Sequence, residues 1–433
     1  MGISSESKDF LAGINAMKHD QPNKLLILAE DKFPPFRVDV ATLFGKKLAG
    51  LGYRIDWILQ SEKDCATSYQ TEWGGGRAWV AATDNGSGRI QRIRKHLRKL
   101  RNEFRVFPLA RRNRYDVIQV KDDFIPAPLA ILAAKMTGAK FTYWLSYPLP
   151  ESDLYQAKAG TARYPLLYLI RGTVFKFLLY KIIMPAADHV FVQSEQMKKD
   201  VADMGIDLKK ITAVPMGVEI EKIPYQQAGP GVQVKSHAGE EKIILYLGTL
   251  LKMRRLDFLL DVLAQVLAKE ESAKLYFVGD GEDPTDRLFL QEKAKELNIE
   301  DHVVFTGFLP MVEAWEYVRR AEVCVSPFYP TFILNSTSPT KLIEYMAMGR
   351  PVVANDHPEQ SLVISESKGG LCVPYEVGAF AEGVLKILHN PAMAAVMGKN
   401  GRRYVTEHRT YDVIAQAVHQ QYQRICHENS SRQ

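Results

Sequence analysis

Short apolar runs with the length of buried strands alternate with segments of helical period along most of the chain. In the first half these runs include KLLILAE (24–30), YRIDWIL, YDVIQV, KFTYWLS and DHVFVQS. The first is followed by a segment in which Val40, Phe44 and Leu48 recur every fourth residue, the spacing of one helix face. Alternation of this kind predicts β-α-β units and a parallel sheet.

The alternation stops at residues 215–240, a segment rich in Gly, Pro and Gln, and then starts again. The second series consists of the strand-like runs KIILYLGT, KLYFVGDG, VVFTGF, EVCVSPF and PVVAND. This series predicts a second parallel sheet, joined to the first by a linker. We expect the helices of the second half at residues 256–270, 286–297, 311–320, 340–348, 378–389 and 393–425.

A chain of 433 residues is longer than one compact domain usually grows, which agrees with two domains. We therefore predict an α/β fold of two Rossmann-like domains with a cleft between them, and we expect the functional site in that cleft. The predicted divisions are residues 1–22 (an N-terminal extension), 23–222 (the first domain), 223–404 (the second domain) and 405–433 (a C-terminal helix that packs back on the first domain, with a polar tail).

The cysteines and the apolar segments bound where the protein works. Cys65, Cys324, Cys372 and Cys426 are far apart and form no C-x-x-C pair, so we expect reduced thiols rather than disulfides or a zinc site. The N-terminus lacks the basic start and apolar core of a signal peptide. No uncharged apolar run approaches the ~18 residues that a membrane span needs. We expect a cytoplasmic protein, either soluble or peripheral on the cytoplasmic face of the membrane.

The stretch STSPTKLIEYMAMGRPVVAND (336–356) has the features of an anion site. Residues 323–343 contain no carboxylate. Pro339 can begin a helix because its missing N–H would have no partner there. The free N–H groups of the next turn and the helix dipole favour an anion, and Ser338, Thr340 and Lys341 add hydroxyls and a positive charge. The alternative is a capped surface helix with a solvated lysine.

Five motifs of the second half, taken in order, resemble family 4 of the glycosyltransferases, which are retaining enzymes of the two-domain GT-B fold. They are YLGTLLKMRRLDFLL, LYFVGDGED, VVFTGFLP, CVSPF and SPTKLIEYMAMGRPVVAND. In the first half, FPPFRVD and VFVQSEQMKKDV also look like that family, so the resemblance covers about residues 24–425. It implies transfer of a sugar from a nucleotide-diphosphate donor, held by the second domain, to a hydroxyl acceptor held by the first. It also implies that the nucleotide sugar is a co-substrate and that no cofactor or metal is needed.

The resemblance assigns two positions to the donor's ribose and sugar. Glu344, on the same helix face as Thr340, matches the glutamate that accepts hydrogen bonds from the ribose hydroxyls. Its apolar neighbours agree, since a buried carboxylate needs a partner. Ser336 stands eight positions earlier, where the family has a second glutamate that meets the transferred sugar. We therefore expect an altered contact with the sugar at Ser336.

The segment GTLLKMRRLD (248–257) resembles the turn that carries cations against the diphosphate. Gly248 begins it, Thr249 replaces the usual arginine, and Arg254 stands at the usual lysine. A diphosphate leaving group gathers negative charge, which cations placed in advance stabilise most in the transition state. We predict that Arg254 and Lys341 are catalytic and that Gly248 and Thr249 contact the donor. The alternative is a solvated basic helix start.

The remaining donor-side and acceptor-side candidates are less specific. In TGFLP (306–310), Phe308 and Leu309 either contact the base or pack in the core, and Glu359 is expected to be structural or to cap a loop. The first domain offers polar residues where strands end, which is where α/β sites form. These acceptor-side candidates, for which ordinary loop polarity is the alternative, are Arg37, Asp39, Lys121, Asp122 and Ser146.

Two segments of the first half favour contact with an anionic lipid or lipid-linked acceptor. Residues 89–114 hold eleven Lys or Arg against one Glu, and each cation near an anionic membrane contributes about 1 kcal/mol. Residues 164–185 mix aromatic and aliphatic residues with spaced cations, a composition typical of an interfacial helix. The alternatives are a solvated basic helix for the first and a buried helix for the second. Nucleic acid is not expected as a partner, since no zinc spacing, helix-turn-helix or aromatic RNA motif accompanies the charge.

Two other classes of function compete with a retaining, metal-independent glycosyltransferase that acts on a glycan or lipid-linked acceptor. A nicotinamide-dependent dehydrogenase is disfavoured because no G-x-G-x-x-G follows a predicted strand. A non-catalytic glycosyltransferase-like subunit that binds a nucleotide sugar is suggested by Ser336, by Thr249 and by the absence of the histidine that the family commonly has. Turnover of the donor would separate this subunit from the enzyme.

Overall fold

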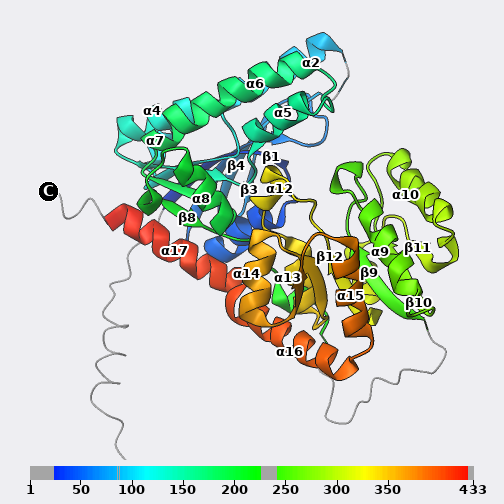
Figure 1. Ribbon diagram of the computed structural model, residues 1–433. Coiled ribbons are helices and arrows are strands. Elements are labelled where there is room, and N and C mark those ends of the chain that lie inside the picture. Colours follow the sequence, from blue (N-terminus) through cyan, green and yellow to red (C-terminus); the bar gives the residue numbers. More distant parts are fainter. Residues whose placement is uncertain (1–23, 85, 87, 226–240, 428–433) are drawn as a thin grey trace, which may run out of the picture. The chain divides into compact units, whose positions relative to one another are not determined.

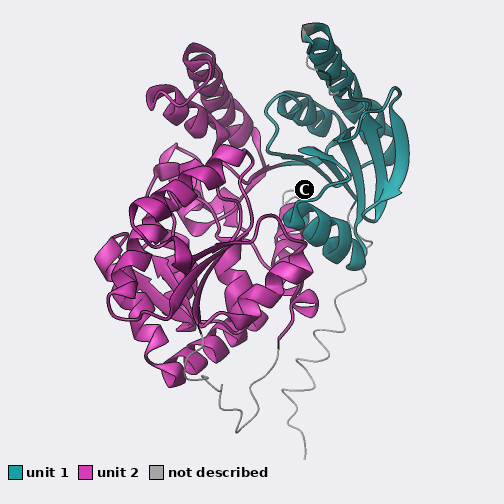
Figure 2. Cartoon of the chain, turned by 90° about the vertical axis from the view of Figure 1, so that its right-hand side faces the viewer, with its two compact units in different colours: residues 1–142, 426–433 teal, residues 143–425 magenta. Residues whose placement is uncertain are grey.

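The structure is a computed structural model that describes residues 24–84, 86, 88–225 and 241–427 (Figure 1). The predicted extension 1–22, most of the linker and the end of the polar tail lie outside the described residues. The chain divides into two compact units, residues 1–142 with 426–433 and residues 143–425 (Figure 2). It passes from one unit to the other within strand β6 (Lys140–Leu145). The division between residues 222 and 223 stays a prediction of the sequence.

The first unit is built on a sheet in which five strands lie in the order β3-β4-β2-β1-β5. All neighbours are parallel except β3 and β4, which form an antiparallel pair that the sequence did not predict. The central strand β1 is buried from Leu25 to Leu28, in agreement with the apolar run that predicted it. The elements are β1 (Lys24–Phe33), η1 (Asp39–Leu48), β2 (Arg54–Ser61), β3 (Tyr69–Trp73), β4 (Gly76–Ala81), α2 (Arg89–Glu103), α3 (Val106–Asn113), β5 (Val117–Lys121) and α4 (Ala127–Thr137).

The second unit begins with a helical segment and a parallel pair of strands, β7 and β8. Helices α5 and α6 can pack closely because Gly172 of α6 has no side chain. A Cβ at this position would lie 2.9 Å from the carbonyl oxygen of Pro150. The elements are α5 (Leu149–Lys158), α6 (Pro165–Leu178), η2 (Leu179–Ile183), α7 (Met184–Ala186), β7 (His189–Val192), α8 (Glu195–Asp203), η3 (Leu208–Lys210), β8 (Ile211–Ala213) and η4 (Ile220–Lys222).

The rest of the second unit is a parallel six-stranded sheet in the order β11-β10-β9-β12-β13-β14. The chain runs outward from β9 in one direction and from β12 in the other, so the carboxyl ends of β9 and β12 form the switch point where α/β proteins bind ligands. The strands are β9 (Lys242–Leu247), β10 (Ala273–Val278), β11 (Val303–Phe305), β12 (Val323–Ser326), β13 (Val352–Asn355) and β14 (Gly370–Val373).

Helices cover both faces of this sheet, as its continuous apolar strands require. Ile244 and Tyr246 point into one core cluster with α9 and α15, whereas Leu245 and Leu247 point into another with α13. The helices are η5 (Lys252–Arg254), α9 (Asp257–Leu267), α10 (Pro284–Glu296), η6 (Glu300–His302), α11 (Met311–Arg320), α12 (Phe332–Asn335), α13 (Thr340–Ala347), α14 (Pro358–Ser367), α15 (Val377–Leu388), α16 (Pro391–His408) and α17 (Tyr411–His427). The predicted α/β fold with parallel sheets is confirmed.

One predicted helix is wrong in its continuity. The segment 393–425 is broken into α16 and α17 at Arg409 and Thr410. At the break the chain forms a bridge, in which the N–H of Val218 donates to the carbonyl of Arg409 at 2.9 Å. This long-range pairing competes with helical hydrogen bonds, and a helical period alone does not reveal it.

Candidate functional site

A cavity of about 310 Å³ lies in the second unit where β9 and β12 end. This is the switch point of the sheet, and the volume is within the range of small-molecule sites. No carboxylate lines it, as the acid-free segment 323–343 predicted. Its walls are formed by Tyr147, Tyr246, Leu251, Met253, Arg254, Pro327, Phe328, Tyr329, Leu334, Thr337, Ser338, Pro339, Thr340 and Lys341.

Gly248 makes room for the side chain of Lys341. Gly248 follows β9 with φ +145°, and a Cβ on it would lie 2.2 Å from Cε of Lys341. The next crossing is equally close, since a Cβ on Gly279 would lie 2.3 Å from the carbonyl oxygen of Gly248. Gly248 does not line the cavity, so its contact with the donor stays a prediction. Its missing side chain instead lets Lys341 reach the cavity.

Arg254 reaches the same place from the turn η5. Its Nη1 donates to the phenol oxygen of Tyr246 at 3.2 Å, and that hydroxyl donates to the carbonyl of Thr249 at 3.4 Å. The Nζ of Lys341 lies 5.4 Å from the centre of the Tyr246 ring. Thr249 itself is exposed and does not line the cavity, so only its backbone takes part in this arrangement.

Neither Arg254 nor Lys341 forms an ion pair with any residue that the structure describes. Burial lowers the pKa of the Lys341 ammonium, and the nearby Arg254 lowers it further. The adjacent Arg255 differs, because it pairs with Asp257 at 3.1 Å. Glu344 attracts the Lys341 ammonium without forming an ion pair with it. Two cations that form no ion pair with a described residue and face one cavity favour an anionic ligand, which would relieve their desolvation and their mutual repulsion.

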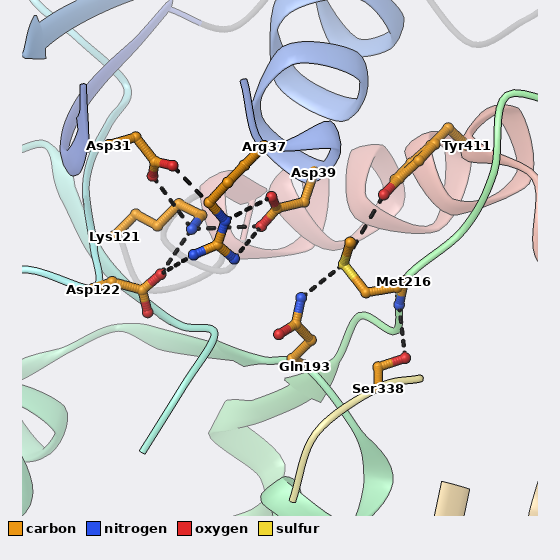
Figure 3. A network of polar contacts seen from close by, with 9 residues as sticks. All are labelled: Asp31, Arg37, Asp39, Lys121, Asp122, Gln193, Met216, Ser338 and Tyr411. Carbon is orange, nitrogen blue, oxygen red and sulfur yellow. Dashed lines mark hydrogen bonds and ion pairs between the residues drawn. The ribbon is translucent and has the colours of Figure 1, made fainter. Parts of the chain in front are cut away.

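The start of α13, which carries Lys341, forms another part of the cavity wall. Pro339, predicted to open the helix, is its N-cap, and Thr340 and Lys341 are the first helical residues. All three line the cavity together with Ser338. The hydroxyl oxygen of Ser338 accepts from the backbone N–H of Met216 at 3.0 Å (Figure 3). The hydroxyl hydrogen of Ser338 stays available, so Ser338 can still donate a hydrogen bond to a bound nucleotide sugar, as predicted.

A buried polar network holds the aromatic wall of the cavity, which the sequence did not predict. The backbone N–H of Phe328 donates to Oδ1 of Asn355 at 2.7 Å, and Nδ2 of Asn355 donates to the carbonyl of Phe328 at 3.0 Å. Gln360 joins the network because its Oε1 accepts a hydrogen bond from the hydroxyl of Ser326 at 2.5 Å. The sequence signal for this network was the Asn in PVVAND, because a buried Asn at the end of a strand must have hydrogen-bond partners.

Ser336 and Glu344 are among the predicted donor-binding residues that lie outside the cavity lining. Ser336 is buried, with its hydroxyl bonded to the carboxylate of Asp200 and its carbonyl accepting from Ser194 at 2.7 Å. Glu344 is partly buried and has no hydrogen bond or ion pair with a described residue. Burial raises its pKa to about 7, an effect that Lys341 partly offsets. Glu344 thus has acceptor capacity to spare, whereas the side chain of Ser336 is already engaged.

The remaining second-half candidates separate clearly. Phe308 is 84% exposed, and Leu309 packs against the core cluster around α13. Glu359 is an ion-pair partner of Arg409 at 2.7 Å, with both groups buried. This buried ion pair gives Glu359 a structural role, which is one of the two that the sequence left open.

The acceptor-side candidates of the first unit form one charged cluster at the carboxyl ends of β1 and β5. In Figure 3, Arg37 and Lys121 lie among three carboxylates, those of Asp31, Asp39 and Asp122. Arg37 makes two bonds to Asp39, at 3.0 and 3.1 Å, while the fully buried Lys121 lies 2.7 Å from Asp122. Asp31 is the member that the sequence missed. The structure thus brings four of the five candidates together.

The fifth acceptor-side candidate, Ser146, is buried at the end of β6 in the second unit, next to the cavity residue Tyr147.

Within the described residues, no group of three or more His, Cys, Asp or Glu side chains is arranged to hold a metal ion. All four cysteines are described, and each is a free thiol. No helix in the described ranges has the length and apolarity to cross a membrane.

Comparison with known families gives two adjacent matches. Residues 40–222 match the family described as "Glycosyltransferase Family 4", and residues 232–404 match the one described as "Glycosyl transferases group 1". The α-monoglucosyldiacylglycerol synthase of Streptococcus pneumoniae is 27% identical over 271 residues, which make up 60% of this chain and 56% of that protein. The chain spans about half the length of the curated relatives that it matches.

Solved structures share the fold over nearly the whole chain. The sucrose-phosphate synthase of Thermosynechococcus elongatus superposes with a TM-score of 0.69 at 20% identity, covering 93% of this chain and 99% of that one. HepE of Anabaena, solved in complex with UDP, gives a TM-score of 0.66 at 14% identity and covers 92% and 99%. These likenesses confirm the two-domain α/β architecture of GT-B proteins.

Proposed function

Because the chain belongs to glycosyltransferase family 4, we propose that it transfers a glycosyl group from a nucleoside diphosphate sugar to a hydroxyl group of a glycan or lipid-linked acceptor. One observation carries the proposal for this chain. Arg254 and Lys341 approach the same cavity, no carboxylate lines it, and neither cation forms an ion pair with a described residue. A diphosphate supplies the charge that these two cations lack.

The same arrangement accounts for catalysis in electrostatic terms. As the bond between the sugar and the diphosphate breaks, negative charge grows on the phosphate oxygen that departs. Arg254 is fixed in advance by the hydroxyl of Tyr246, and Lys341 by the space over Gly248, so neither group has to reorganise during the reaction. The two cations supply positive charge in the place of a metal ion, which makes the proposed transfer metal-independent.

The transfer proceeds with retention in this proposal. The bond between the anomeric carbon and the diphosphate oxygen breaks, and its electron pair goes to the diphosphate. The acceptor oxygen bonds to the anomeric carbon on the face that the diphosphate leaves, and the acceptor proton passes to the departing phosphate oxygen. This route needs no protein base, which fits the engaged carboxylates of the charged cluster around Lys121.

A lipid-linked acceptor at a membrane surface is supported by helix α6. Its side chains Leu166, Ile170, Val174 and Phe177 lie on one exposed apolar face. The cations of the helix are neutralised on the other side, where Arg171 pairs with Asp153 of α5 at 2.6 Å. An exposed apolar face with neutralised charge suits insertion between lipid headgroups. The pneumococcal relative is named as the synthase of a glucosyldiacylglycerol, which is a glycolipid.

A second candidate function is a subunit that binds a nucleotide sugar without transferring it. The observation that favours it is the buried hydroxyl of Ser336, which bonds to Asp200 at the position where the family resemblance expects a sugar contact. Such a subunit binds the nucleotide sugar and leaves it intact. The enzyme, in contrast, hydrolyses the donor slowly when no acceptor is present.

The test is an assay of transfer and donor hydrolysis with UDP-, GDP-, ADP- and dTDP-linked sugars, each with and without EDTA. We expect one donor to be consumed, with EDTA causing no loss, and the product to keep the anomeric configuration of the donor by NMR. Lys341→Met removes consumption, whereas Lys252→Gln, a cation of the same turn as Arg254 that does not line the cavity, retains it. Binding of a donor that is never consumed would establish the second candidate instead.

A further inference from the structure

A second polar pocket, of about 290 Å³, lies in the first unit beside α2. It is formed by the loop that precedes β3 and by three arginines of the basic segment. The glycosyl transfer described above assigns no role to it. Its lining residues are Ala66, Thr67, Ser68, Ala82, Arg98, Arg101, Asn102 and Arg105.

The three arginines face one way because of their spacing. Residues three and seven positions apart lie on the same face of a helix, so Arg98, Arg101 and Arg105 point to the same side of α2 and the turn after it. Asn102 fixes the helix in this rotation, with its Nδ2 donating to the carbonyl oxygens of Leu59 at 3.1 Å and Trp79 at 2.9 Å. The convergence is therefore built in by a buried anchor and does not depend on mobile side chains alone.

The charge of this pocket is not neutralised by the part of the chain that the structure describes. No described residue forms an ion pair or hydrogen bond with the side chains of the three arginines, and no carboxylate lines the pocket. Lys99, on the opposite face of α2, behaves differently: its Nζ lies 2.5 Å from Asp123 and 3.6 Å from Glu103. Acidic residues thus neutralise Lys99, whereas the three arginines of the pocket stay available to another partner.

The pocket also offers a hydroxyl donor. The oxygen of Ser68 accepts from the backbone N–H of Ala82 at 3.1 Å, which orients the hydroxyl and leaves its hydrogen free to donate. Guanidinium groups and hydroxyls together present several N–H and O–H donors, and the side chains supply no negative charge. Tetrahedral phosphate oxygens match such a set, since arginine binds phosphate through two parallel hydrogen bonds.

We propose that Arg98, Arg101, Arg105 and Ser68 bind a phosphate group, in a site separate from the sugar-donor cavity and additional to the proposed transfer reaction. The phosphate belongs either to a lipid headgroup or to a soluble phosphate ester. The exposed apolar side chains Ile93 and Leu97 precede the pocket on the same helix, which is the arrangement that a headgroup at a membrane surface would meet.

The experiment compares two variants of the full chain that lose the same charge. Arg101→Gln with Arg105→Gln alters the pocket, and Arg111→Gln with Arg112→Gln alters exposed cations of α3 that do not line it. One arm titrates sn-glycerol 3-phosphate and inorganic phosphate by calorimetry. The other measures co-sedimentation with phosphatidylcholine vesicles that contain phosphatidylglycerol. Circular dichroism confirms that both variants are folded.

We expect the pocket variant to bind at least about tenfold more weakly than the control variant in one arm, which corresponds to the loss of one charge-assisted hydrogen bond. Weakening in the calorimetric arm identifies a soluble phosphate ester. Weakening only in the vesicle arm identifies a lipid headgroup. Equal behaviour of the two variants in both arms would overturn the proposal, because charge alone would then explain any binding.

Discussion

The side chain of Lys341 crosses the backbone of Gly248 so closely that a Cβ on residue 248 would lie 2.2 Å from its Cε. Two segments almost a hundred residues apart are thereby fitted to each other at the end of β9. The glycine is needed twice, since its φ of +145° is also a conformation that other residues rarely adopt. This fit puts the ammonium of Lys341 beside the ring of Tyr246, at the cavity where Arg254 also ends.

We therefore expect Gly248→Ala to displace Lys341 and to abolish measurable transfer. The backbone strain alone costs about 1–3 kcal/mol, so the free energy of unfolding should fall by a similar amount. Chemical denaturation and a donor consumption assay measure the two effects. Gly378→Ala is the matched control, because a Cβ there meets only the Gln265 side chain at 3.7 Å. If Gly248→Ala keeps full activity, the close crossing has no role in placing Lys341.

Tyr246→Phe should weaken nucleotide binding without removing the cation that binds. The hydroxyl of Tyr246 is the described partner of Arg254, so its loss lets the guanidinium move and costs about 1 kcal/mol of stability. Calorimetry with the preferred nucleotide should give an affinity about fivefold to tenfold lower. Tyr276→Phe loses a comparable bond, to Glu241 at 2.6 Å, and should leave nucleotide affinity unchanged. Equal losses in both variants would contradict a positioning role for Tyr246.

Glu344 should make stability depend on pH near neutrality. Burial raises its pKa from 4.5 to about 7, so the folded state binds the proton more tightly than the unfolded state. The resulting stabilisation is complete below about pH 4.5 and is lost as the pH rises through 7, by up to about 3 kcal/mol. Denaturation between about pH 5 and 8 should show this decline, and it should be absent from Glu344→Gln.

The same residue predicts the pH dependence of nucleotide binding. Ribose hydroxyls donate hydrogen bonds, which favour the ionised carboxylate of Glu344. Nucleotide affinity should therefore rise through about pH 7 more steeply in the wild type than in Glu344→Gln. The comparison with the variant cancels the titration of the nucleotide's own phosphate. Parallel curves would exclude Glu344 as a ribose contact.

Glu359 and Arg409 should behave as a buried structural pair. Glu359→Ala leaves a buried guanidinium without its carboxylate and should lower the free energy of unfolding by about 3–5 kcal/mol. The double variant Glu359→Leu with Arg409→Met should recover most of that loss, because neither charge remains buried. Glu316→Ala, which breaks an exposed pair with Arg319, should cost less than about 1 kcal/mol. A loss of nucleotide binding with unchanged stability in Glu359→Ala would contradict a structural role for Glu359.

The fold could be predicted because its determinants are periodic and local. Buried parallel strands read as short apolar runs, and the helix predicted at 311–320 has the bounds of α11. The break at Arg409 could not be predicted in the same way, because it depends on pairing with the distant residue Val218. The antiparallel pair of β3 and β4 is a local hairpin across Gly74 and Gly75, and it was missed in the sequence. The exposed strand β3 also lacks the apolar alternation that marks a strand.

The two cations of the cavity could be predicted from the sequence, whereas the residues that hold its aromatic wall in place could not. Lys341 and Arg254 stand out in a segment without acids, and the structure puts both on one cavity. The aromatic wall and its anchor Asn355 were missed, since a buried amide is recognised only when its partners are known. Ser336 shows the reverse case. It is a polar residue at the start of a site motif, but its hydroxyl is hydrogen-bonded to Asp200, which is distant in sequence.

The central claim is that Arg254 and Lys341 hold the diphosphate of a nucleotide sugar, and thermal unfolding with UDP, GDP, ADP and dTDP tests it most directly. A nucleotide at 100 times its dissociation constant should stabilise the wild type by about 2.7 kcal/mol. We predict this stabilisation for one base, its loss in Arg254→Met and Lys341→Met, and its persistence in Lys252→Gln. An equal shift in all variants, or no shift with any nucleotide in the folded wild type, would contradict the account.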